Sequence, residues 1–379
     1  MIPFNKPFLS GKETEYIRQA VESGKISGDG GFTKKCHAFF EERYGFQKCL
    51  LTTSCTDALE MAAILINIQP GDEVILPSYT FVSTANAFVL RGAKLVFCDS
   101  RPDHPGMDES LLETLITPAT KAIVPVHYAG VACDMNTILK LAQQYDLYVI
   151  EDAAQAIDSY YTFPDGSRKP LGGIGHLAAF SFHETKNIIS GEGGMLVIND
   201  SQFNERAEII REKGTNRSKF FRGEVDKYGW VDIGSSFLPS DIIAAFLYSQ
   251  LEHIDEIQKN RSNVYNQYQT LLQKADTGCK LPQLPSYATN NAHMFYLICS
   301  SLHERTALIK HLLKNGILSV FHYQSLHRAE YFLKSNLLRD LPMSDYYTNH
   351  LLRLPFYYDL EQKEVETICT SISVFYDNV

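Results

Sequence analysis

The sequence predicts an α/β protein with a large lobe on a mostly parallel seven-stranded sheet and a smaller α+β lobe after it. Up to Asn199, seven short apolar segments alternate with helical patterns. Most of these segments lack a polar–apolar alternation, as is typical of strands covered by helices on both faces. After Asn199 this order stops, and one long helical pattern leads into short strands and helices.

The seven predicted strands indicate where function is expected. Helical patterns between them, such as Asp57–Ile66 and Met135–Tyr145, give the β-α-β order of a parallel sheet. Ligands bind such sheets at the carboxyl ends of the strands, so the residues just after each strand are the candidates for chemistry. The strands are Cys49–Thr53, Glu73–Pro77, Lys94–Cys98, Ala122–Val126, Leu147–Glu151, Leu177–Phe182 and Met195–Asn199.

The rest of the chain predicts a connecting helix and a second lobe. A helix at Phe203–Lys213 and a polar, glycine-containing stretch precede a long helical pattern at Pro239–Leu272. We therefore expect a large domain over residues 1–250, and a connecting helix with a small domain over residues 251–379. The small domain is expected to hold strands at His293–Cys299 and Leu318–Tyr323 and helices at Glu304–Asn315 and Glu361–Phe375.

Composition and charge exclude several classes of protein. The chain has 379 residues, enough for two or three domains, and a net charge of −9 that argues against a general nucleic-acid binder. No segment approaches the roughly 18 apolar residues of a membrane span, and no signal peptide precedes the fold, so we expect a cytoplasmic protein. The eight cysteines are scattered without a CxxC pair, which favours buried free thiols and predicts no metal site.

The most informative segment places a lysine directly after a strand. Phe180–Asn187 (FSFHETKN) contains Lys186, and the pair Gly193-Gly194 that follows permits a tight turn and a close approach. A lysine in a partly dry cleft has a lowered pKa, which suits Schiff-base chemistry. The alternative is an ordinary surface lysine, which only the neighbouring motifs can exclude.

A carboxylate follows another buried strand. The run Val149-Ile150-Glu151 delivers Asp152 to the carboxyl edge of the sheet, and Ala153-Ala154-Gln155 follows. A carboxylate at this place can keep a pyridinium nitrogen protonated, which is the condition that makes pyridoxal 5'-phosphate (PLP) an electron sink. Gln155 would then lie near the phenolic oxygen of the cofactor. The alternative is Asp152 as the N-cap of a following helix.

Two further strand ends complete the pattern. Thr52–Leu59 (TTSCTDAL) is a hydroxyl-rich turn that runs into a helix, whose free N–H groups and dipole suit a phosphate, although ordinary capping uses the same residues. Pro77–Asn86 (PSYTFVSTAN) puts Tyr79 and Phe81 just past a strand, where a flat ring can stack on one of them. Simple core packing is the alternative for both aromatics.

In this order the motifs are specific, and the chain resembles the PLP-dependent nucleotide-sugar aminotransferases of the DegT type, which have the aspartate-aminotransferase fold (fold type I). The resemblance covers nearly the whole chain. The segments that carry it also include Ser27–Thr33 (SGDGGFT), Val124–Cys133 (VPVHYAGVAC), Glu212–Ser218 (EKGTNRS), Asn291–Tyr296 (NAHMFY) and Phe321–Tyr323 (FHY).

The resemblance implies a role for each cofactor residue. It implies that Lys186 binds PLP covalently and that Asp152 pairs with the ring nitrogen. The remaining implied contacts are Gln155 near the ring hydroxyl, Phe81 on the ring face, and Ser181, Thr56 and the backbone N–H of Cys55 at the phosphate. Relatives often have glycine where Cys55 stands, so only a backbone role carries over to it.

Substrate and partner follow from the same resemblance. It implies a homodimer that shares its active sites, although Ser236 stands where many relatives place an asparagine that reaches the neighbouring cofactor. His183 is a candidate for a sugar or phosphate contact, with a packed histidine as the alternative. Further substrate candidates are the loop residues Gly28, Asp29 and Gly30, the polar residues Asn216 and Arg217, and His322 and Tyr323 of the small lobe.

The implied reaction is transamination of TDP-4-keto-6-deoxy-D-glucose to TDP-4-amino-4,6-dideoxy-D-galactose, with L-glutamate as amino donor, for surface polysaccharide synthesis. Sugar dehydratases related to this family carry histidine at the position of Lys186, so the lysine favours transamination. The glucose-configured product and amination at C3 of an isomeric ketosugar remain open. A non-catalytic PLP-binding regulator is a second hypothesis. A nicotinamide dehydrogenase is a third, but the first strand is not followed by G-x-G-x-x-G.

Overall fold

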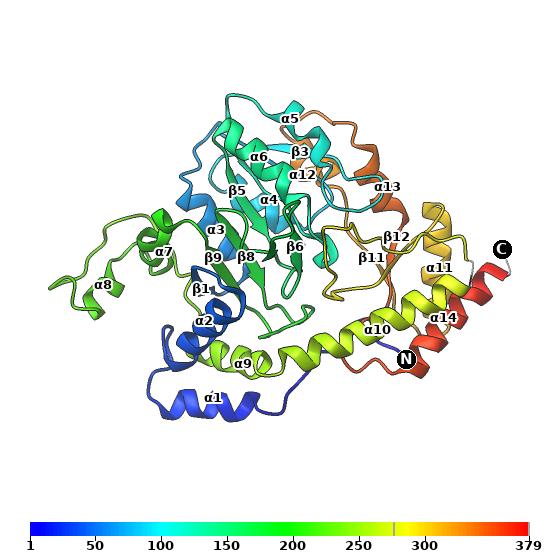
Figure 1. Cartoon of the computed structure of the whole chain (residues 1–379), viewed down its shortest axis with the longest axis horizontal. Coiled ribbons are helices and arrows are strands. Elements are labelled where there is room, and N and C mark those ends of the chain that lie inside the picture. Colours follow the sequence, from blue (N-terminus) through cyan, green and yellow to red (C-terminus); the bar gives the residue numbers. More distant parts are fainter. Residues whose placement is uncertain (276, 378–379) are drawn as a thin grey trace.

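The computed structural model describes residues 1–275 and 277–377, and a seven-stranded sheet lies at its centre (Figure 1). The strand order is β1-β9-β8-β5-β4-β2-β3, and within this sheet only β9 runs antiparallel to its neighbours. The predicted mostly parallel sheet is therefore confirmed. Its strands are β1 (Lys48–Thr52), β2 (Glu73–Pro77), β3 (Lys94–Cys98), β4 (Thr120–Ile123), β5 (Tyr148–Asp152), β8 (Leu177–Ser181) and β9 (Gly194–Ile198).

Helices cover both faces of this sheet, which explains the apolar strands. In β2 the side chain of Ile75 packs into one hydrophobic core, whereas Val74 and Leu76 pack into the other. Because alternate side chains of a strand point to opposite faces, both faces need apolar residues. One face is covered by α2 (Gly31–Tyr44), α6 (Met135–Tyr145) and α9 (Asp241–Leu251), and the other by α3 (Cys55–Leu65), α4 (Val82–Val89) and α7 (Asn204–Arg211).

A second, antiparallel sheet forms the smaller lobe. Its order is β10 (Tyr296–Ile298), β12 (Leu351–Arg353), β11 (Val320–Phe321). The N-terminal segment joins this lobe, because Ile2 bridges to Ile317 and Phe4 accepts a hydrogen bond from the N–H of Phe356. The helices here are α10 (Ile254–Lys274), α11 (Leu302–Lys314), α12 (Glu330–Leu333), α13 (Pro342–His350) and α14 (Gln362–Asp377).

The structure differs from the sequence prediction in one helix and in three short strands. The long helix predicted at Pro239–Leu272 is two helices, α9 and α10, which separate at Glu252 and His253. No glycine or proline marks this break, so the sequence pattern runs through it. The prediction also lacks strand β12 and the hairpin of β6 (Tyr160–Thr162) and β7 (Arg168–Pro170).

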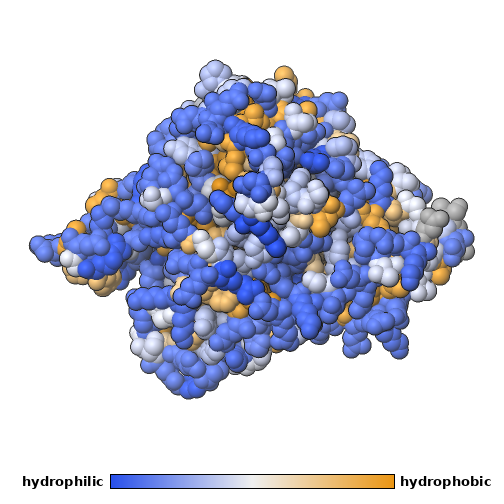
Figure 2. All heavy atoms as spheres, in the orientation of Figure 1, coloured by the Kyte–Doolittle hydropathy of each residue, from blue (hydrophilic) through white to orange (hydrophobic). Residues whose placement is uncertain are grey.

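The remaining elements are short, apart from one surface helix. Helix α1 (Glu13–Glu22) lies beside α9 at the edge of the molecule (Figure 1). The segment with α8 (Arg217–Phe221) projects from the body, and Figure 2 shows apolar atoms near its tip. Of its side chains, Phe221 and Trp230 are 66% and 85% exposed.

None of the described helices is both long and apolar enough to cross a lipid bilayer. The short helix α5 spans Leu112–Leu115.

Asp241 joins α9 to the start of α2. Its buried carboxylate accepts hydrogen bonds from the backbone N–H of Phe32 (3.2 Å) and from both the N–H (2.8 Å) and the hydroxyl (2.7 Å) of Thr33. The two backbone N–H groups are unpaired donors of the first helical turn, so Asp241 caps α2 from another element. A Cβ at Gly30 would lie 2.4 Å from this carboxylate, which requires glycine there.

Replacing Asp241 with alanine should lower the free energy of unfolding by about 2 kcal/mol, because buried donors lose their acceptor. Chemical denaturation of the protein without cofactor measures this. Asp200, which caps a short 3₁₀ turn at the surface, gives the matched control, and Asp200→Ala should cost less. Equal losses in the two variants would contradict the capping role.

Candidate active site

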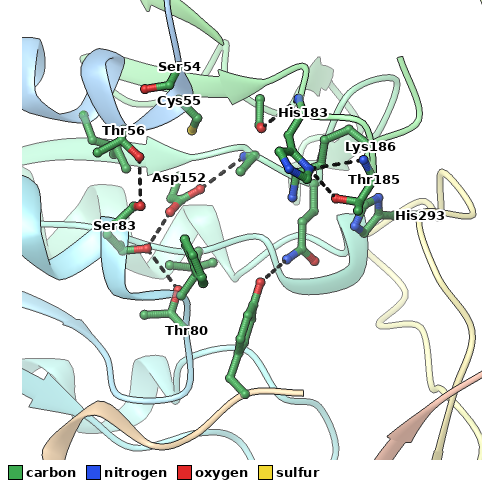
Figure 3. Close-up of a pocket in the computed structure, with 18 of the residues that line it drawn as sticks. Ser54, Cys55, Thr56, Thr80, Ser83, Asp152, His183, Thr185, Lys186 and His293 are labelled. Atoms are coloured by element: carbon green, nitrogen blue, oxygen red, sulfur yellow. Dashed lines mark hydrogen bonds between the residues drawn. The ribbon is translucent and has the colours of Figure 1, made fainter. Parts of the chain in front are cut away.

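One cavity of about 540 Å³ opens at the carboxyl ends of the central strands (Figure 3). Its walls come from the turns after β1, β2, β5 and β8 and from the small lobe. The structure thus brings together these predicted residues: Cys55, Thr56, Phe81, Asp152, Gln155, Ser181, His183, Lys186, His322 and Tyr323.

Asp152 is the last residue of β5, and its carboxylate is fixed from two sides. Thr84 of α4 donates to Oδ2 at 2.7 Å, and the N–H of Ala154 donates to Oδ1 at 3.1 Å. Burial raises the pKa of this carboxyl, and the two hydrogen bonds oppose the rise. A cationic partner inside the cavity would keep it ionised.

Lys186 lies in the turn between β8 and β9. Backbone hydrogen bonds from Phe182 to Gly193 (2.9 Å) and from Glu184 to Gly191 (2.9 Å) close this turn. No described residue forms a hydrogen bond or an ion pair with Lys186 Nζ. Burial lowers the pKa of Lys186, as does the charge of Arg353, so its amine is easier to deprotonate than a surface lysine. A neutral amine is the nucleophile that Schiff-base chemistry needs.

The N-terminus of α3 forms the opposite corner of the cavity. Ser54 caps the helix by accepting from the N–H of Asp57 at 3.0 Å, whereas the N–H groups of Cys55 and Thr56 have no acceptor among the described residues. The N-terminal end of β9 packs against this turn so closely that a Cβ at Gly194 would lie 2.3 Å from the carbonyl carbon of Ser54. The corner can therefore receive a phosphate through backbone donors.

Gln155 and the small-lobe aromatics form the third wall. The side chain of Gln155 accepts from the N–H of Ala129 at 2.6 Å and donates to the hydroxyl of Tyr323 at 3.1 Å. His322 lies against Tyr323 and shares a 2.9 Å hydrogen bond with the hydroxyl of Tyr128. Phe81 is 55% exposed and borders the cavity, with its ring 6.0 Å from that of Tyr323.

Among the histidines and cationic side chains that line the cavity, two were not predicted as site residues. His293 shares a 2.8 Å hydrogen bond with the side chain of Asn187, next to Lys186. Arg353 ends β12, the strand that was not predicted. The sequence signal for His293 was present in the segment Asn291–Tyr296, but its hydrogen-bond partner Asn187 is 106 residues away in the chain. No local pattern indicates Arg353.

The other predicted substrate residues lie outside this cavity. Gly28 and Gly30 are buried against the start of α9, Asp29 pairs with Arg211 at 2.5 Å, and Arg217 lies 3.5 Å from Glu212. Asn216 accepts a hydrogen bond from the N–H of Gly229 at 2.8 Å, and Ser236 is exposed beside the projecting segment. Within a single chain these contacts give the glycines and charges structural partners, and the substrate roles stay predictions.

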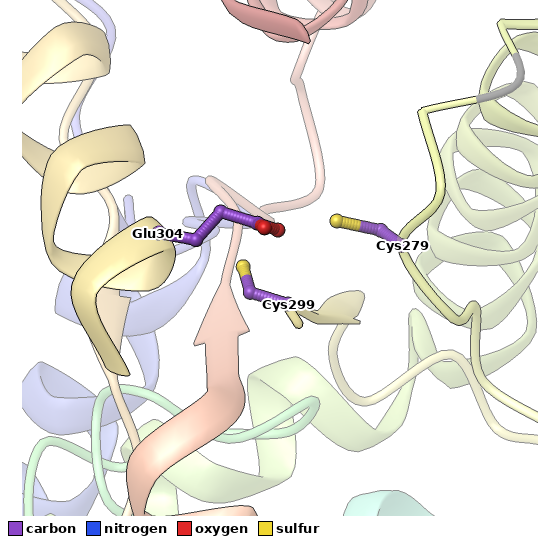
Figure 4. A group of neighbouring side chains, drawn as sticks. All are labelled: Cys279, Cys299 and Glu304. Atoms are coloured by element: carbon purple, nitrogen blue, oxygen red, sulfur yellow. The ribbon is translucent and has the colours of Figure 1, made fainter. Parts of the chain in front are cut away.

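A separate polar cluster lies in the small lobe. The side-chain ligand atoms of Cys279, Cys299 and Glu304 lie within 4.8 Å of one another (Figure 4). The hydroxyl of Tyr376 lies 2.8 Å from the sulfur of Cys279 and donates to Glu304 at 2.7 Å. The group is thus a hydrogen-bonded network, and none of its members lines the cavity.

The cavity fits PLP on its own chemistry. It offers backbone donors and hydroxyls for a phosphate, a buried carboxylate for a ring cation, and an unpaired amine for an aldehyde. With the α/β sheet that places these groups at its strand ends, it defines a PLP-dependent enzyme of fold type I.

Comparison with known families identifies the chain further. Residues 7–373 match the DegT/DnrJ/EryC1/StrS aminotransferase family, so the protein belongs to that family and is a PLP-dependent aminotransferase. It is 32% identical to GDP-perosamine synthase of Caulobacter vibrioides, over 97% of this chain and 96% of that one. It is 30% identical to the spore coat polysaccharide biosynthesis protein SpsC of Bacillus subtilis, over 98% and 96% of the two chains.

Solved structures agree with this fold. The S. venezuelae protein DesV, crystallised in complex with a ketimine intermediate, superposes with a TM-score of 0.90 at 28% identity, over 100% of this chain and 99% of that one. The PLP form of the putative sugar aminotransferase Spr1654 from Streptococcus pneumoniae gives a TM-score of 0.90 at 24% identity, over 100% and 99%, and supports the fold.

Replacing Gly194 with alanine should weaken PLP binding by about tenfold or more, because the new methyl group collides with the backbone that receives the phosphate. Titration of the cofactor-free protein with PLP, followed by absorbance, measures this affinity. Gly31→Ala is the control, since nothing lies within 4 Å of a Cβ there. Wild-type affinity in Gly194→Ala would contradict the phosphate corner.

Proposed function

We propose that the protein aminates a nucleotide-linked ketosugar, using L-glutamate as the amino donor. The observation that carries this proposal is the cavity in which Lys186 and Asp152 face a common space at the strand ends of a chain of this aminotransferase family. The likeness to GDP-perosamine synthase and to a spore coat polysaccharide protein supports a sugar substrate that serves surface polysaccharides.

For the individual substrate, we propose TDP-4-keto-6-deoxy-D-glucose and the product TDP-4-amino-4,6-dideoxy-D-galactose. The segments Val124–Cys133 and Glu212–Ser218 support this choice through their resemblance to nucleotide-sugar 4-transaminases. The glucose-configured product and amination at C3 are the alternatives. They differ in which face or carbon of the sugar meets Lys186.

The chain's own residues divide the work of the reaction. When bound, PLP supplies an electron sink for the carbanion formed at the donor's α-carbon. Asp152 stabilises the positive charge on the ring nitrogen, and the fixed bonds from Thr84 and Ala154 keep its carboxylate in place. Lys186, once released by the donor amine, moves the proton between the donor's α-carbon and C4′ of the cofactor.

We further propose that two copies of the chain share their active sites. The projecting segment supports this, because Phe221, Trp230 and Val231 expose apolar area that another subunit would cover. Ser236 lies at the base of the same segment, exposed to solvent and outside its own cavity. An exposed Ser236 is available to a neighbouring cofactor.

The purified, PLP-loaded protein should convert TDP-4-keto-6-deoxy-D-glucose and L-glutamate to an aminated sugar whose NMR spectrum shows nitrogen at C4 in the galacto configuration. Lys186→Ala should lose both this product and the absorbance band of the lysine-bound cofactor. Lys140→Ala, on the outer surface of α6, should keep both. A PLP-loaded protein that shows the band and forms no aminated sugar would overturn the enzymatic proposal and favour a regulator.

A further inference from the structure

Arg353 brings a positive charge into the cavity from the small-lobe side. It ends β12, the middle strand of the small sheet, and its neighbours across the sheet are Tyr296 of β10 and Val320 of β11. Its Nε is buried and has no hydrogen-bond partner, and no described residue forms an ion pair with its guanidinium. The ring of Phe4 covers one face of the guanidinium, with 4.9 Å between the Cζ atom and the ring centroid. The planar fork of N–H donors is thus left for a ligand.

The groups around Arg353 do not neutralise it. Burial, followed by the nearby positive charges, lowers the pKa of His293 and of His322 well below the usual value, so both imidazoles are neutral at pH 7. The cavity-lining carboxylates are Asp152 and Glu192, and neither pairs with the guanidinium. A half-buried cation whose Nε is buried and unpaired is costly, and a carboxylate or phosphate ligand would offset that cost.

The buried Arg261 makes different contacts. Arg261 of α10 donates to the carbonyl groups of Ala292 (3.0 Å) and His293 (2.7 Å), which holds the loop before β10 in place. Its donors are used inside the fold, so it needs no ligand. Arg353 differs because it lines the cavity and its guanidinium has no acceptor among the described residues.

We propose that Arg353 binds a carboxylate of the amino donor through paired hydrogen bonds. The cofactor phosphate has its own donors at Cys55 and Thr56, on the large-lobe side. Arg353 and Lys186 line the same cavity, so an anion held by the guanidinium lies in the space that the lysine also borders. Planar carboxylates match the guanidinium fork. This inference rests on the proposed function for the identity of the donor.

The test uses the PLP-loaded full chain and glutarate, a dicarboxylate that has no amino group to react. Calorimetric titration should show binding to the wild type, a loss of affinity of roughly 10- to 100-fold in Arg353→Gln, and an intermediate affinity in Arg353→Lys. Arg305→Gln is the matched control. Arg305 lies in the same lobe, donates to the carbonyl of Thr348 at 2.7 Å and does not line the cavity.

A second measurement distinguishes a role of Arg353 in binding the amino donor from a role in binding the sugar. In Arg353→Gln, the glutamate concentration needed to discharge the lysine-bound cofactor should rise, whereas the pyridoxamine form should still react with the ketosugar. Unchanged glutarate affinity in Arg353→Gln would overturn the proposal. Loss of the sugar reaction alone would also overturn it, because Arg353 would then bind the diphosphate. Loss of PLP binding in both Arg353→Gln and Arg353→Lys would overturn it as well, because it would indicate a structural role.

The proposed function and the proposed carboxylate site at Arg353 can be contradicted independently of each other. If the wild type binds glutarate through Arg353 and yet aminates no nucleotide sugar, the carboxylate site stands and the proposed substrate is wrong. If the ketosugar is aminated normally by Arg353→Gln at wild-type glutamate concentrations, the proposed function stands and the carboxylate site is wrong.

Discussion

Three ionisable groups share one cavity without an ion pair between any two of them: Asp152, Lys186 and Arg353. Burial disfavours the charged form of each, so three such groups without ion pairs are costly unless a ligand compensates them. A ligand with a cationic ring, an aldehyde and a carboxylate-bearing partner would satisfy all three. The fold maintains this separation because β5 and β8 are neighbours in register, which fixes Asp152 opposite Ala179 while the lysine enters on the following turn.

The large lobe could be predicted because its signals are local. Each strand of the central sheet is a short apolar run that ends at a turn, and the predicted bounds of β2 and β3 match the observed ones. The break between α9 and α10 could not be predicted, because no residue at Glu252 or His253 interrupts the helical pattern. Strand β12 was not predicted for a different reason. It is three residues long, and its pairing with β10 and β11 stabilises it more than any local pattern does.

The site residues likewise fall into those that local sequence signals predict and those that they do not. Asp152, Lys186 and the turn at Cys55 follow strands, so the rule that ligands bind at carboxyl ends finds them from the sequence. Arg353 and His293 enter from the small lobe, and their position depends on how the two lobes pack. The loop with Gly28 and Gly30 differs from these residues, because the sequence pointed to it as a ligand-binding loop and it lies outside the cavity. Inside one chain its glycines allow close packing against Leu238 and Asp241, and their predicted contact with substrate stays a prediction.

Lys186 is the residue proposed to hold the cofactor, and the roles of the other cavity residues depend on it. The direct measurement is reduction of the PLP-loaded protein with borohydride, followed by proteolysis and mass spectrometry of the peptides. A pyridoxyl group on Lys186 alone is the predicted result. A pyridoxyl group on any other lysine, or none on the peptide that contains Lys186, would contradict the arrangement of the whole cavity.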